Sequence, residues 1–66
     1  MLDIDRVFVP SRPQMKFNAT TPQDVLMEWL MLDIDDFPIV TDRSGAHWTL
    51  TVDENALAGY TWIAVE

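Results

Sequence analysis

The pattern of hydrophobic and polar positions predicts four strands. In the first, acidic and apolar residues alternate and then give way to a run that is apolar on both faces, so the second half of this strand should be better buried. In the third, Trp48, Leu50 and Val52 fall on one face and polar residues on the other, as in a half-buried antiparallel strand. The expected strands span residues 2–9, 37–41, 46–52 and 60–65.

A single helix is predicted between the first two strands. Thr21 can cap the first free amide groups, Pro22 suits the first helical turn, and Asp24 complements the positive end of the helix dipole. Apolar residues then recur at spacings of three and four up to about residue 32. The stripe that should face the core consists of Val25, Leu26, Trp29, Leu30 and Leu32.

The remaining segments are predicted to connect these elements. Prolines and basic residues mark 10–20 as a surface segment, which Phe17 is expected to pin to the core. Residues 42–45 form a good turn sequence, so the strands on either side of them should pair as a hairpin. Residues 53–59 are expected to hold a single helical turn that stops at Gly59.

Together these elements predict the fold class α+β. We expect one small domain over residues 1–66, with the order β-α-β-β-β and one helix packed on a face of an antiparallel or mixed sheet. At 48% apolar residues the chain should fold, yet a core of this size leaves only about 3–5 kcal/mol of net stability. Without cysteine, no disulfide or thiolate metal site can add to it. A homodimer or a bound partner is therefore a candidate source of further stability.

Charge restricts the location and the partners. No apolar run is long enough to span a bilayer, and the first residues do not form a secretion signal, so a cytoplasmic protein is expected. The net charge of −7 argues against direct binding to nucleic acid or to an anionic membrane, because both need basic patches. The expected partner is another protein with a basic surface.

Residues that carry enzymatic chemistry are scarce. His47 is the only histidine, and Ser11 and Ser44 lie in turn sequences without the glycines of a nucleophile elbow. The acidic segment that begins at Asp33 fails the calcium-loop pattern, because its sixth residue is Pro38 instead of glycine and its twelfth is not glutamate. We therefore expect a protein that is not an enzyme and binds no metal or cofactor.

The acidic residues are concentrated in the middle of the chain. Residues 17–42 hold six acidic and no basic side chains, and three of the acids directly follow the helix. There they face the negative end of the helix dipole and repel one another, so stability alone would favour basic residues. Such a conflict favours a binding role, although the acids could instead serve only as a solubilising face. The candidate acidic contacts are Asp24, Glu28, Asp33, Asp35 and Asp36.

Two methionines extend this candidate surface. Met27 and Met31 are four residues apart and lie outside the stripe that should face the core. Methionines in such places are either core filler or an adaptable patch for a partner. Because Trp29 is expected to face the core, we predict that both methionines are apolar contacts with the partner.

These observations predict a non-enzymatic, acidic protein-binding module. In its sharpest form it is an inhibitor that imitates the phosphates of a nucleic acid and docks on the basic nucleic-acid-binding surface of its partner. The alternative is a small structural or assembly subunit that self-associates through its helix or through an edge formed by its last strand.

Overall fold

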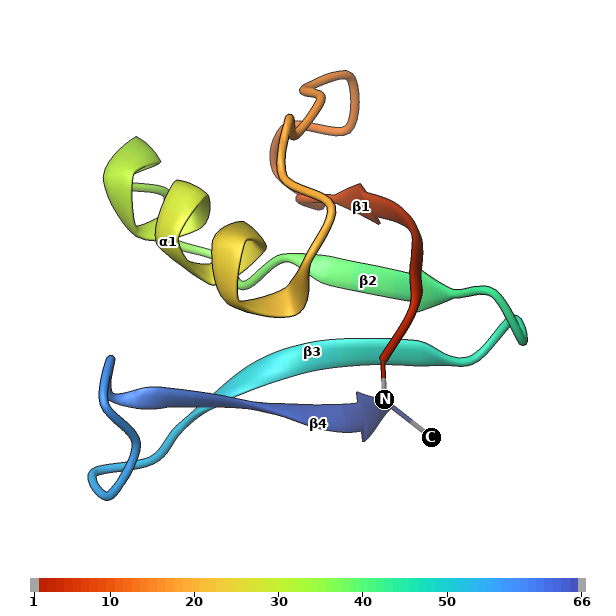
Figure 1. Ribbon diagram of the computed structural model, residues 1–66. Helices are drawn as coiled ribbons and strands as arrows, with labels where there is room; N and C mark the ends of the chain where they lie inside the picture. The colour runs from red at the N-terminus through yellow and green to blue at the C-terminus, as the bar shows by residue number, and fades with distance from the viewer. Residues whose placement is uncertain (1, 66) are drawn as a thin grey trace.

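One helix packs against a four-stranded sheet in the computed structural model, which describes residues 2–65 (Figure 1). Neighbouring strands pair in the order β1-β2-β3-β4, and every pair is antiparallel. The predicted α+β class and element order are confirmed, and the sheet is antiparallel. The elements are β1 (Ile4–Phe8), α1 (Pro22–Leu32), β2 (Ile39–Asp42), β3 (His47–Val52) and β4 (Tyr60–Val65).

Both ends of α1 follow from local chemistry. The Thr21 hydroxyl accepts the N–H of Asp24 at 3.2 Å, and Pro22 occupies the first turn, as predicted. Asp33 ends the helix in the left-handed conformation, with φ of 54°, and its N–H donates to the carbonyl of Leu30 at 3.4 Å. At 11 residues α1 is too short to cross a bilayer, and residues 2–65 contain no other helix that could do so.

The hydrophobic core lies between α1 and one face of the sheet, with Trp29 at its centre. The Trp29 ring contacts Phe37 and Tyr60 at centroid distances of 5.4 and 5.2 Å, and its Nε1–H donates to the carbonyl of Asp36 at 2.9 Å. Phe17, from the segment between β1 and α1, packs against this core as predicted. The buried apolar residues are Val9, Val25, Leu26, Trp29, Ile34, Val40 and Leu50.

The buried stripe of α1 is narrower than the sequence predicts. Val25, Leu26 and Trp29 are buried, but Leu30 and Leu32 keep 37% and 39% of their surface exposed, so their assignment to the core was wrong. A single helix on one sheet is covered only along the side that faces the sheet, and residues on its flanks stay open. Two leucines that should have filled the core therefore add to the surface.

The β2–β3 hairpin is organised by one carboxylate. Asp42 Oδ1 accepts hydrogen bonds from the N–H and hydroxyl of Ser44 at 2.9 and 2.6 Å, and from the N–H of Ala46 at 2.9 Å. Its Oδ2 accepts the Nε1–H of Trp48 at 2.9 Å. These donors, led by the Ser44 hydroxyl and the Trp48 indole, lower the pKa of Asp42 to about 2. The predicted turn is confirmed.

The connection between β3 and β4 is not the helical turn that the sequence predicts. Two successive turns form instead, closed by bonds of 3.0 Å from Ala56 N–H to the Asp53 carbonyl and of 3.1 Å from Gly59 N–H to the Ala56 carbonyl. The N–H of Asp53 then donates to the carbonyl of Gly59 at 2.9 Å. Because this last bond holds the two ends of the segment together, the chain must turn back, and a continuing helix would carry the ends apart.

Candidate protein-binding surface

Four of the predicted contact residues lie on one side of α1. Asp24, Met27, Glu28 and Met31 recur at spacings of three and four, which places them opposite the buried stripe. Met27 is 47% exposed and Met31 is 83% exposed. These four residues are here called the outer face of α1. They line a shallow trough together with Asn18, Ala19 and Leu32. The structure therefore brings the predicted apolar contacts and two of the predicted acids together.

Leu30 and Leu32 enlarge this surface. With the two methionines they make four large apolar side chains that an 11-residue helix leaves at least 37% exposed. Scattered exposed apolar residues are ordinary, but four of them on one short helix make this helix the candidate site for contact with a partner. Sequence reasoning missed both leucines because their spacing matches a core stripe, and only the narrow contact with the sheet shows otherwise.

Glu28 also stabilises the fold through hydrogen bonds to the segment before α1. Its carboxylate accepts the N–H of Asn18 at 3.1 and 3.2 Å and the N–H of Ala19 at 3.1 Å, so it holds the segment before α1 against the helix. The side chain is half-buried, and its charge stays at the border of the outer face. No local sequence signal predicts this link, because donor and acceptor are nine and ten residues apart.

Asp36 does not belong to the outer face, because its carboxylate is bonded to Ser11. It accepts the N–H of Ser11 at 2.8 Å and the Ser11 hydroxyl at 2.6 Å, which ties the segment after β1 to the segment after α1. The Ser11 hydroxyl is the main cause that lowers the pKa of Asp36, and the positive charge of Arg12 lowers it further. Among the predicted acidic contacts, this one is an anchor within the fold.

Asp33 and Asp35 lie together just past the C-terminal end of α1, and both are exposed. Asp33 combines two unfavourable features, a left-handed backbone conformation and a negative charge at the negative end of the helix dipole. The five predicted acids therefore occupy three places: the outer face of α1, the C-terminal end of the helix, and the link to Ser11.

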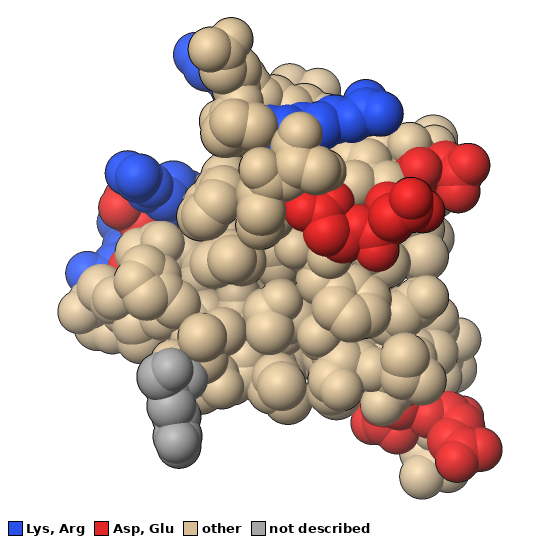
Figure 2. All heavy atoms as spheres, turned by 180° about the vertical axis from the view of Figure 1, so that it is seen from behind, with Lys and Arg blue, Asp and Glu red and all other residues tan. Residues whose placement is uncertain are grey.

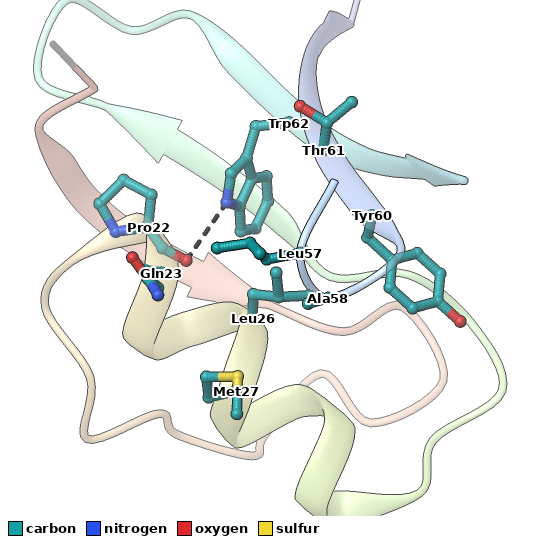
Figure 3. Close-up of a pocket in the computed structure, with 9 residues that line it drawn as sticks. All are labelled: Pro22, Gln23, Leu26, Met27, Leu57, Ala58, Tyr60, Thr61 and Trp62. Carbon is teal, nitrogen blue, oxygen red and sulfur yellow. Dashed lines mark hydrogen bonds between the residues drawn. The ribbon is translucent and has the colours of Figure 1, made fainter. Parts of the chain in front are cut away.

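A groove separates the first half of α1 from β4 (Figure 3). It has a volume of about 310 Å³, and its walls include Leu26 and Met27 from the helix and Tyr60 and Trp62 from the strand. At its edge the Nε1–H of Trp62 donates to the carbonyl of Pro22 at 3.2 Å (Figure 3). The groove is mostly apolar, and no carboxylate or histidine lines it.

No helix within residues 2–65 covers the face of the sheet away from α1. The strand register places Phe8, Ile39, Thr49 and Ile63 opposite one another in a row that crosses all four strands. Figure 2, the view from behind Figure 1, shows an acidic group that reaches from the upper right towards the middle of the molecule, and an uncharged area below this group. Ile63, at the β4 end of the row, is 43% exposed.

Residues 2–65 offer few side chains that are arranged for catalysis or metal binding. His47 Nδ1 lies 3.1 Å from the Thr41 hydroxyl, and both side chains are on the open face of the sheet at the β2–β3 hairpin. Within residues 2–65, no three histidine or carboxylate side chains gather closely enough to hold a metal ion.

Comparison with protein families, with curated proteins and with solved structures finds no match for this chain. The functional argument therefore rests on the surfaces described above.

Proposed function

We propose that this protein is a non-enzymatic protein-binding module that docks on its partner through the outer face of α1. The observation that carries the proposal is the exposure of Met27 and Met31 beside Asp24 and Glu28 on one helix face. Methionine side chains adapt their shape to a partner, and their apolar contact supplies affinity. The carboxylates at their border supply the preference for a basic partner.

The charge distribution supports a basic surface on the partner. Asp33 and Asp35 extend the negative charge beyond the C-terminal end of α1, and α1 itself carries no basic residue. A helix that places an apolar stripe in a groove and carboxylates at its rim fits a groove that is bordered by arginine or lysine. The most specific version of this proposal is that the module is an inhibitor. It would occupy a nucleic-acid-binding site of its partner, because spaced carboxylates can replace phosphates there.

The experiment that tests the proposal is capture of binding proteins by the full chain and by matched variants. Met31→Ser removes the most exposed apolar side chain of α1, and Val52→Ser removes an apolar side chain that is 70% exposed at the end of β3. A partner that uses the outer face is lost with Met31→Ser and retained with Val52→Ser. Equal capture by both variants would contradict the proposal.

Salt and competition then test the nature of the partner surface. Contacts between carboxylates and a basic surface should weaken as salt rises, because exposed charges are screened over about 8–10 Å at physiological ionic strength. If the partner surface is a nucleic-acid-binding site, an excess of double-stranded DNA should displace the module. A complex that resists both salt and DNA would rule out docking on a basic surface and imitation of a nucleic acid. Docking through the apolar side chains would then be the only form of the proposal left.

A further inference from the structure

β4 lies at one edge of the sheet. Within residues 2–65 it pairs with β3 on one side and with no strand on the other. The bond from Asp53 N–H to the Gly59 carbonyl identifies a hydrogen-bonded pair one step beyond Val52 and Tyr60. Hydrogen-bonded and non-bonded pairs alternate along an antiparallel ladder. Counting from that pair, the residues whose N–H and C=O groups point to the open edge are Tyr60, Trp62 and Ala64.

The two edges of the sheet are protected differently. β1, at one edge, contains Asp5 and Arg6, and its register shifts between Ile4 and Arg6, which indicates a bulge. Charges and bulges are the features that keep edge strands from pairing with other chains. β4, at the other edge, has the sequence Tyr-Thr-Trp-Ile-Ala-Val, with no charge, no proline and no shift in its register with β3. The open edge is therefore suited to pairing.

We propose that β4 pairs with β4 of a second copy of this chain, antiparallel and around a two-fold axis at Trp62. In this register Trp62 lies opposite Trp62 of the second copy, and Tyr60 lies opposite Ala64. All three outward N–H groups and all three outward C=O groups of each copy then find partners. A two-fold axis at Thr61 or Ile63 would leave some of these groups unpaired.

The second copy fits this edge for three reasons. Each chain carries a net charge of −7, and the uncharged β4 lets two copies meet without placing like charges opposite each other. The pairing places Thr61 of the second copy beside Ile63, so the row across the open sheet face continues into the second sheet. Finally, a single core of this size leaves about 3–5 kcal/mol of net stability, and small domains commonly gain more by association.

The test uses the full chain and two substitutions at one exposed position. Ala64→Pro removes an outward N–H, which β3 does not use, and Ala64→Ser keeps it. We expect the wild-type mass from light scattering to rise with concentration from 7.6 kDa to twice that value. Ala64→Pro loses two hydrogen bonds per dimer and should weaken dimerisation about tenfold or more, whereas Ala64→Ser should not.

Amide hydrogen exchange tests the register directly. In the dimer, the amides of Tyr60, Trp62 and Ala64 should become protected, whereas the amides of Thr61, Ile63 and Val65 are already bonded to β3 and protected in the monomer. A strict monomer at all concentrations would overturn the proposal. So would a dimer that is unaffected by Ala64→Pro, or protection of these amides only when a different protein is added.

The β4 pairing and docking through α1 can be tested separately, because they should respond differently to salt. The β4 pairing uses no charged residue, so rising salt should leave it unchanged or strengthen it by screening the net charge of each copy. Docking of the outer face on a basic partner should weaken under the same conditions. Failure of one proposal therefore leaves the other standing.

Discussion

At the residue scale, carboxylates are the most informative side chains of this protein. The sequence presents eleven acids as one class, whereas the structure divides them by their hydrogen-bond partners. Asp42 organises a hairpin, Asp36 and Glu28 hold loops, and Asp33 adopts an unfavourable left-handed conformation at the end of α1. Each of these situations leads to a different experimental result.

The lowered pKa values of Asp36 and Asp42 predict the acid response of the fold. Both carboxyls bind protons less readily in the folded chain than in the unfolded chain, so their contribution to stability is complete above the ordinary value of 3.8. It should be lost as the pH falls from about 4 towards 2, where Asp42 titrates in the folded state. Thermal unfolding across this range tests the prediction. Asp42→Ala should lower the midpoint at pH 7 and flatten the pH dependence, and an unchanged profile would contradict the assigned role.

Asp33 should show a conflict between stability and binding. Glycine adopts the left-handed conformation without strain, and it removes the charge from the negative end of the helix dipole. Asp33→Gly is therefore expected to raise the free energy of unfolding by about 1 kcal/mol and to weaken docking. Chemical denaturation measures the first effect and partner capture the second. Asp33→Asn removes the charge but tolerates the left-handed conformation, so it should show the same loss of docking.

At the element scale, the sequence predicts best what depends on neighbouring residues. Thr21, Pro22 and Asp24 define the start of α1 within four residues, and Asp42 to Gly45 define the hairpin turn within another four. The predictions fail where a distant segment decides. Leu32 has the spacing of a core residue but lies on an open flank, and residues 53–59 must bring two strand ends together. Neither fact is encoded locally.

The link between Glu28 and the segment before α1 is a second feature that only the structure shows. Glu28→Ala should release the N–H groups of Asn18 and Ala19, so their amide exchange should accelerate while the amides of α1 remain protected. Asp24→Ala, on the same helix face, is the matched control because its carboxylate holds no loop in place. If both variants leave the exchange of Asn18 and Ala19 unchanged, the carboxylate does not fix this segment.

At the scale of the whole molecule, the small core leaves several apolar surfaces of the protein exposed. Residues 2–65 form a body of 28 × 24 × 20 Å with one buried layer between α1 and the sheet. The outer face of α1, the groove beside β4 and the open sheet face all remain outside that layer. The sequence predicts the number and order of the elements, but which apolar residues stay exposed depends on how one helix lies across four strands.

The thin core predicts high sensitivity to substitution within it. Leu50 is fully enclosed between the sheet and α1, and Leu50→Ala should cost about 2–5 kcal/mol, which approaches the whole stability expected of a domain this small. The variant should therefore be largely unfolded by circular dichroism. Val52→Ala, two residues along the same strand face but exposed, should change stability by less than about 0.5 kcal/mol. A folded Leu50→Ala protein would show that the core contributes less than this account requires.

Docking through the outer face of α1 is tested most directly by the methyl signals of the methionines in the presence of a captured partner. Met27 and Met31 lie on that face, whereas Met15 packs against the core and serves as an internal reference. With methyl-labelled methionine, titration of the partner should shift or broaden the Met27 and Met31 signals and leave the Met15 signal in place. Changes at Met15 alone, or binding that leaves the Met27 and Met31 signals unperturbed, would contradict docking through α1.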